Sequence, residues 1–139
     1  LGSREEIIYE TYAKTINIEA LTMINMASKK YIPAVVGYTR LLADTVIAVR
    51  EAGAEPFVQS ELLGEVNEKL KEARAALKKL EKLTAEATAM TEATAQAFFY
   101  KDAVKAAMEE LRSPIDALEM LVDKKVWPVP SYGELTFEV

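Results

Sequence analysis

The chain has 139 residues, half of them hydrophobic, and 17 basic against 22 acidic residues give a formal net charge of −5. The acidic excess argues against a nucleic-acid partner. The chain has no Cys and no His, which excludes disulfides and thiolate metal sites and removes the commonest general base. The length fits one domain, residues 1–139, and the abundance of Ala, Glu, Lys and Leu predicts an all-α fold.

No apolar run in the sequence approaches the ~20 residues that span a bilayer, and Arg4 and its acidic neighbours stand where a signal peptide would become apolar. We therefore expect a cytoplasmic domain with no membrane partner. The first residue is Leu1 and not Met, so we also expect a processed product or a fragment of a longer protein.

The first predicted element is a helical segment over residues 3–52, with Ser3 and Glu6 as a capping box at its start. Its apolar residues form two stripes, which predicts burial on two sides. The first stripe is Ile8, Tyr12, Thr15 and Ile18, and the second is Ile16, Ala20, Met23 and Ala27. Pro33 interrupts the pattern, and an unbroken helix of this length would extend roughly 75 Å. We predict a kink or a break at Lys30–Pro33.

The second predicted helix covers residues 60–91. Gly53 ends the preceding helix as its C′ residue, Pro56 prevents continuation, and Ser60 is the expected cap. The seam alternates spacings of three and four residues, as in a coiled coil. It consists of Leu63, Val66, Leu70, Ala73, Leu77, Leu80, Thr84 and Ala87.

A turn near Met90–Thr94 is predicted to lead into a third helix over residues 94–125. Its seam is in phase through Pro114, which predicts a kink and not an end. The seam residues are Val104, Met108, Leu111, Ile115, Leu118 and Val122. The expected architecture is an antiparallel bundle of three to four long helices, the first kinked or broken near Pro33 and the third kinked near Pro114.

The last segment, residues 126–139, has no helical period. Pro128 and Pro130 force their preceding residues into extended conformations. Its large apolar side chains predict that this extended tail docks on the long first helix or its neighbours. They are Trp127, Tyr132, Leu135, Phe137 and Val139.

The charged side chains offer little chemistry, and we predict no catalytic, cofactor-binding or metal-binding residue. Paired carboxylates can act as acid and base, but a solvated helix face is the more common explanation for those near the end of the third helix. These are Glu109, Glu110, Asp116 and Glu119. A basic run on the second helix could attract anions, but interleaved glutamates favour a solvated face there too. It contains Lys69, Lys71, Arg74, Lys78, Lys79 and Lys82.

Two aromatic groups remain as possible partner sites. Core packing at the end of the bundle is the favoured explanation for Phe98, Phe99 and Tyr100. The segment Trp127–Tyr132 could equally wrap its own bundle or insert into a neighbouring domain or subunit. A free-standing helical adaptor that binds a partner through the heptad seam is the alternative to a domain of a larger protein.

Two stretches resemble a known family. Thr15-Ile16-Asn17-Ile18-Glu19-Ala20-Leu21-Thr22-Met23-Ile24 is similar to the start of the C-terminal region of type III glutamine synthetases. Trp127-Pro128-Val129-Pro130-Ser131-Tyr132-Gly133-Glu134-Leu135 resembles that family's closing motif, with Ser131 and Glu134 as mild departures from Thr and Asp. Between them, Glu110-Leu111-Arg112 and Asp116-Ala117-Leu118-Glu119 resemble its last helix.

The resemblance implies a C-terminal helical domain of a ligase that uses ATP and magnesium to join ammonia to glutamate. It also implies an upstream catalytic domain that holds the catalytic residues, and neighbouring subunits in a dodecamer of two stacked hexameric rings. No catalytic motif of the family is present in this chain, so the domain is expected to contribute packing, assembly or regulation.

Overall fold

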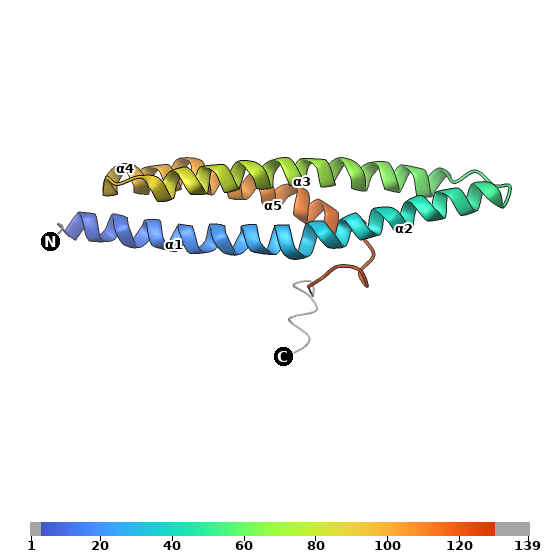
Figure 1. The fold of residues 1–139 in the computed structure, drawn as a ribbon, viewed down its shortest axis with the longest axis horizontal. Coiled ribbons are helices and arrows are strands. Elements are labelled where there is room, and N and C mark those ends of the chain that lie inside the picture. Colours follow the sequence, from blue (N-terminus) through green and yellow to red (C-terminus); the bar gives the residue numbers. More distant parts are fainter. Residues whose placement is uncertain (1–3, 130–139) are drawn as a thin grey trace.

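The computed structural model describes residues 4–129, and all of its regular elements are helical. Three antiparallel rods lie side by side and give the domain an elongated shape (Figure 1). The all-α antiparallel bundle is thus confirmed. The predicted capping residue Ser3 and the tail beyond Val129 lie outside the described residues.

The first rod is continuous and consists of α1 (Arg4–Met26), the π-helical turn η1 (Ala27–Tyr31) and α2 (Ile32–Glu51). The backbone N–H of Ile32 donates to the carbonyl of Ala27, five residues earlier. Proline in a helix clashes with the carbonyl four residues before it, and a wider turn moves that carbonyl away. Of the two alternatives at Pro33, the break is therefore wrong. Figure 1 shows α2 leaving the line of α1 at this point.

The loop after α2 has the predicted stop signal. Gly53 has φ +93°. Its N–H donates to the Arg50 carbonyl over 3.1 Å, and the Ala54 N–H donates to the Val49 carbonyl over 3.2 Å. These two bonds form a Schellman motif, which satisfies carbonyls that the helix end leaves open.

The second rod is α3 (Phe57–Ala89), which begins one turn before the predicted start at residue 60. Ser60 is not the cap. Its N–H donates to the Pro56 carbonyl over 3.0 Å, so Pro56 itself precedes the first helical residue. A proline is tolerated at a helix start because the first-turn N–H groups have no intrahelical partner there.

The third rod consists of α4 (Ala93–Phe99), a second π-helical turn η2 (Tyr100–Val104) and α5 (Lys105–Leu121). The predicted turn near Met90–Thr94 is confirmed, and the Glu92 carboxylate caps α4 by accepting from the N–H groups of Thr94 and Ala95. The helix continues through Pro114 as expected but ends at Leu121 and not at residue 125. Asp123 stops it, because its side chain accepts the Lys125 N–H and its carbonyl accepts the Val126 N–H.

The core lies where the three rods meet, and both predicted seams face it. The most extensive contact is between α3 and α5, and α2 packs mainly on α3. The largest fully buried side chains are Leu77, Leu80, Leu111, Leu118, Val35, Val66 and Val104. The heptad seam of α3 is therefore used inside the domain and is not available to a partner helix.

Candidate functional site

The four acidic residues considered for acid–base chemistry lie on α5 but form no common site. Glu110 pairs with Lys79 of α3 at 3.0 Å, and Glu109 pairs with Arg112 at 2.8 Å, both at the surface. Within residues 4–129, no three His, Cys, Asp or Glu side chains gather where they could hold a metal ion. The described residues thus do not fit a magnesium site, and we derive no step through magnesium or ATP in this domain.

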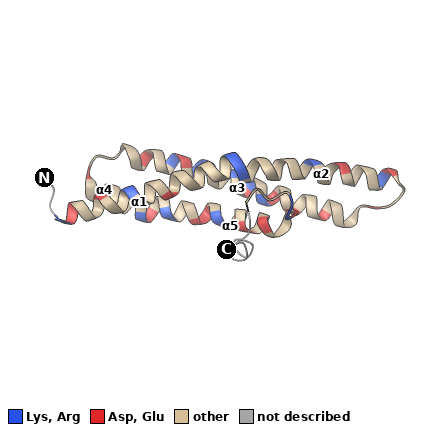
Figure 2. Cartoon of the chain, turned by 90° about the horizontal axis from the view of Figure 1, so that it is seen from below, with Lys and Arg blue, Asp and Glu red and all other residues tan. Residues whose placement is uncertain are grey.

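The basic run of α3 is likewise spread over a mixed surface. Lys69 pairs with Glu72 at 3.1 Å, and Lys79 forms the cross-helix pair with Glu110. Figure 2 shows acidic and basic residues interspersed along the helices and not separated by sign. Such a surface offers no concentrated field for an anionic ligand.

The three consecutive aromatic residues at the end of the bundle have different roles. Tyr100 is buried in η2, where its hydroxyl donates to the Asn17 side chain over 3.1 Å and lies 3.4 Å from the Thr88 hydroxyl. This connects all three rods. Phe99 packs against the core. Core packing is therefore confirmed for these two residues, whereas Phe98 is half-exposed near Tyr9, with ring centres 5.9 Å apart.

The start of the tail contacts the first rod at η1. The Trp127 ring is buried and stacks on Tyr31, with centroids 5.1 Å apart and an interplanar angle of 24°. The prediction that the tail docks on the first helix is confirmed for Trp127, while Tyr132 and the residues after it lie outside the described chain. The Trp127 indole N–H is buried and has no hydrogen-bond partner among the described residues.

A groove of about 480 Å³ lies between α1 and α5 and ends at Tyr31. Its lining combines Met23, Met26 and Met108 with other apolar side chains and the polar residues Glu19 and Arg112. Burial raises the pKa of the Tyr31 phenol above its ordinary value, and the carboxylates of Glu119 and Asp116 raise this pKa further. The phenol therefore remains a neutral hydrogen-bond donor at ordinary pH.

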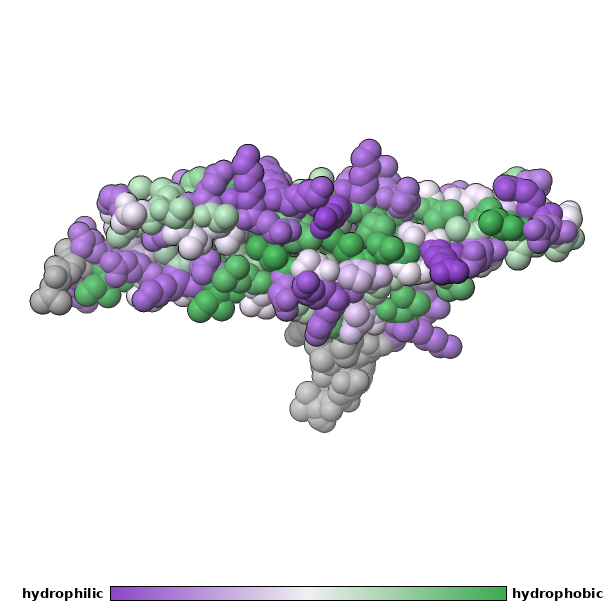
Figure 3. All heavy atoms as spheres, in the orientation of Figure 1, coloured by the Kyte–Doolittle hydropathy of each residue, from purple (hydrophilic) through white to green (hydrophobic). Residues whose placement is uncertain are grey.

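The first rod also carries an outer face that no neighbouring rod covers. We define the outer face as the large apolar residues of α1 and α2 that are more than half exposed. They are Ile7, Ile8, Ile18, Leu21, Val36, Leu41 and Ile47. Of the two predicted stripes, the second faces the core at Ile16, Ala20 and Ala27, whereas the first leaves Ile8 and Ile18 exposed. Figure 3 shows hydrophobic residues along the middle of one face of the molecule and hydrophilic residues along its α3 edge.

The continuous helix Arg4–Glu51 is long and apolar enough to cross a membrane by length and composition, and 17% of its most apolar window is buried. This corrects the expectation that no segment approaches that length. A single helix of this kind is weak evidence and does not indicate a membrane protein.

The chain is similar in sequence to known proteins. A family model described as the glutamine synthetase C-terminal domain matches residues 1–50, the same stretch that forms the first rod. A glutamine synthetase of Butyrivibrio fibrisolvens is 34% identical over 139 residues, which is 99% of this chain. The chain matches the C-terminal domain of glutamine synthetases.

Two further relatives agree with this assignment. The type-3 glutamine synthetase of Dictyostelium discoideum is 32% identical, and a glutamine synthetase of Bacteroides fragilis is 26% identical, each over 99% of this chain. The chain spans 20% of the length of each of the three relatives. No solved structure matches it. The glutamine synthetase resemblance is thus confirmed, and the alternative of a free-standing adaptor is not supported.

Burial on two sides of the first helix was predicted from its two stripes, but the residues that remain exposed were not, although a signal was available. Thr11, Thr22 and Thr45 each stand four residues after an outer-face residue, and each hydroxyl donates to that residue's carbonyl. Such a bond satisfies the threonine hydroxyl within the helix, so these polar atoms need no water when the face is covered.

Proposed function

We propose that this chain is the non-catalytic C-terminal helical domain of a type III glutamine synthetase. The parent protein would join ammonia to glutamate with ATP and magnesium, and residues outside this chain would perform the reaction. This domain would act in packing, assembly or regulation of the parent. The observation that carries the proposal is the match over 99% of the chain to a one-fifth part of glutamine synthetases.

The arrangement of the domain supports a structural role. Its apolar seams are buried in a long bundle, and some of its acidic residues form surface ion pairs such as Lys79–Glu110. What the bundle leaves available is a long apolar surface on the first rod. A protein uses such a surface for contact with another protein part and not for bond making.

The proposed partners are the upstream catalytic domain and the neighbouring subunits of the parent. The assembly proposed for the parent is a dodecamer of two stacked hexameric rings, as the resemblance implies. The proposed location is the cytoplasm. ATP and magnesium are proposed for the parent alone.

The test is an assay of glutamine formation from glutamate, ammonia and ATP, with the 139-residue chain and the parent polypeptide measured side by side. We expect turnover by the parent and none by the chain. Turnover by the chain itself would contradict the non-catalytic assignment. A parent that folds and shows no glutamate- and ammonia-dependent activity would contradict the assignment to the synthetase.

A further inference from the structure

On α1 the buried side of the first rod has mostly small residues, and the exposed side has larger apolar residues. Ala13, Ala20 and Ala27 recur every seven residues on the buried side of the rod. On the opposite side Ile18 is 65% exposed and Leu41 is 52% exposed. A helix whose outer side meets water normally carries charged or polar residues there. On α1 large apolar residues stand on that side instead, which is the arrangement expected of a helix that is covered on both sides.

Threonine hydroxyls on the outer side are already satisfied within the rod. The Thr11 hydroxyl donates to the Ile7 carbonyl over 2.8 Å, and the Thr22 hydroxyl donates to the Ile18 carbonyl over 2.9 Å. Desolvating such groups leaves no donor without a partner, which removes the main cost of burying polar atoms.

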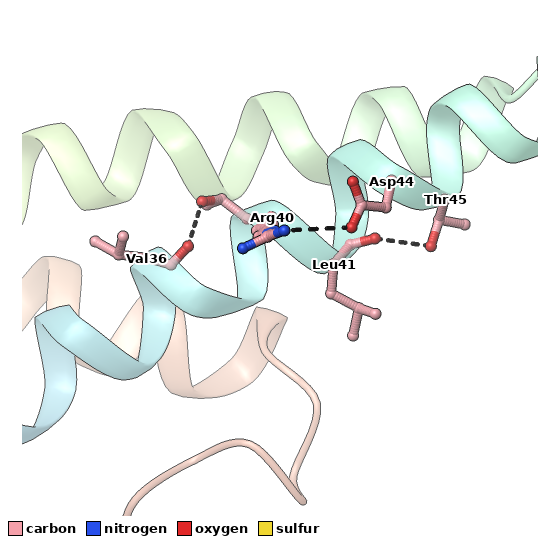
Figure 4. Close-up of polar contacts among 6 residues, drawn as sticks. Val36, Arg40, Leu41, Asp44 and Thr45 are labelled. Carbon is pink, nitrogen blue, oxygen red and sulfur yellow. Dashed lines mark hydrogen bonds and ion pairs between the residues drawn. The ribbon is translucent and has the colours of Figure 1, made fainter.

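The same holds on α2, shown in Figure 4. The Thr45 hydroxyl donates to the Leu41 carbonyl over 2.8 Å, and Arg40 lies 4.0 Å from Asp44 in an ion pair one turn apart. The two exposed charges in this part of α2 thus neutralise each other. The outer face therefore presents apolar side chains and methyl groups with little net charge.

The size of the outer face fits a domain interface. The first rod has 48 residues, so at ~1.5 Å per residue and a helix width of about 10 Å this side covers roughly 700 Å². Interfaces between domains of one chain bury about 600–1,500 Å². Between Thr15 and Ser28 the rod has only the acidic Glu19 as a charged residue, so this part of the face offers no cation to lipid headgroups.

We propose that the outer face of α1–α2 docks on the part of the same glutamine synthetase chain that lies outside this domain. This rests on the proposed function. The chain spans only 20% of its relatives, so four-fifths of a parent of that length is available to cover it. The family model for the C-terminal domain matches residues 1–50 and thus coincides with the rod that carries the face.

The test is hydroxyl-radical footprinting of the full-length parent with mass spectrometry, which reports the solvent access of individual side chains. Ile18 and Leu41 are the probes, Leu77 with 0% exposure is the buried reference, and Met120 with 86% exposure is the exposed reference. We expect Ile18 and Leu41 to oxidise at rates close to that of Leu77 after correction for intrinsic reactivity, and Met120 to remain reactive. Oxidation of Ile18 and Leu41 at the rates of half-exposed side chains would overturn the proposal.

A second copy and a membrane are the competing occupants, and two further arms distinguish them. Protection that disappears when the parent is diluted to single subunits would assign the face to a neighbouring subunit, and protection that requires phosphatidylcholine vesicles would assign it to lipid. Either result overturns docking within one chain. Protection that persists in single subunits without lipid supports it.

A matched pair of parent variants completes the test. Ile18→Glu places a charge in the proposed contact and should raise the oxidation of Leu41 severalfold, whereas Met120→Glu, at an exposed position of α5, should leave it unchanged. An unchanged Leu41 rate in Ile18→Glu would contradict the docking. Glutamine formation is assayed in the same preparations, so that an inactive parent with a protected face refutes the proposed function and leaves the docking intact.

Discussion

The inner and outer sides of the first rod differ in a way that explains what this domain can and cannot do alone. On α1 the inner side is made of alanines and Ile16, and it lets the helix approach α3 and α4 closely. The outer side carries larger residues such as Ile18 and Leu21, which stay more than half exposed next to residues 4–129. Burial on the inner side stabilises the bundle, whereas the outer side contributes stability only when another surface covers it.

The largest expected effect comes from the core between α3 and α5. Leu111→Ala removes a side chain with 0% exposure, and the cavity it leaves should lower the free energy of unfolding by about 2–5 kcal/mol. Met120→Ala, at an exposed position of the same helix, should change it by less than about 0.5 kcal/mol. Urea unfolding followed by circular dichroism measures both. Equal effects of the two variants would mean that the helices are not packed as described.

Trp127 tests whether the start of the tail belongs to the bundle. The stack on Tyr31 buries most of its ring. Trp127→Ala should therefore lower the free energy of unfolding by about 2–3 kcal/mol, somewhat less than the loss of a fully enclosed aromatic residue. The melting temperature should fall by several degrees, and Lys125→Ala at an exposed position serves as the control. If both variants have the melting temperature of the wild type, the start of the tail contributes no stability to the isolated domain.

A pair of substitutions on α1 tests the contrast between its two sides directly. Ala20 has 0% exposure, so Ala20→Leu should overpack the contact and destabilise the domain by about 1–3 kcal/mol. Ile18→Ala, on the outer face, should change the free energy of unfolding of the isolated chain by about 0.5 kcal/mol or less. The contrast is lost if Ile18→Ala is the more damaging variant in urea unfolding.

The smallest effect concerns pH. The pKa of Tyr31 is raised in the folded state, first by burial and then by Glu119 and Asp116. The associated stability is fully present below the unfolded pKa of about 10 and is lost as pH rises through the folded value. The wild type should therefore lose more stability than Tyr31→Phe when urea unfolding is repeated at increasing pH above about 10. Parallel losses in the two proteins would show that the Tyr31 phenol is not perturbed.

Much of the fold could be predicted because apolar residues at spacings of three and four specify helices and their buried seams. The seams through Leu77 and Leu111, the Gly53 stop and the turn near Met90 all follow from such local signals. The π-helical turns could not be predicted, since one extra residue per turn barely changes the apolar spacing. The end of α5 at Leu121 depends on hydrogen bonds of Asp123 that compete with the helix, and sequence spacing does not rank such alternatives.

The outer face was harder to predict than the fold. The two stripes of the first helix were visible in the sequence, but which of them faces the core depends on how α3, α4 and α5 are placed. From the sequence, Glu109 and Glu110 were candidates for acid–base chemistry. In the structure they form ion pairs with Arg112 and Lys79. A domain with the role that we propose, contact with a larger protein, would have no motif of its own to reveal that role.

The most direct test compares two variants of the full-length parent, one changed at the candidate carboxylates of α5 and one changed at the outer face. One variant replaces the candidate carboxylates of α5 with amides (Glu109→Gln, Glu110→Gln, Asp116→Asn and Glu119→Gln), and the other changes the outer face (Ile18→Glu and Leu41→Glu). The measurement is the kcat for glutamine formation. We predict that the amide variant stays within about twofold of the wild type and that the outer-face variant loses more than about tenfold. Loss of turnover in the amide variant with an unaffected outer-face variant would contradict the account.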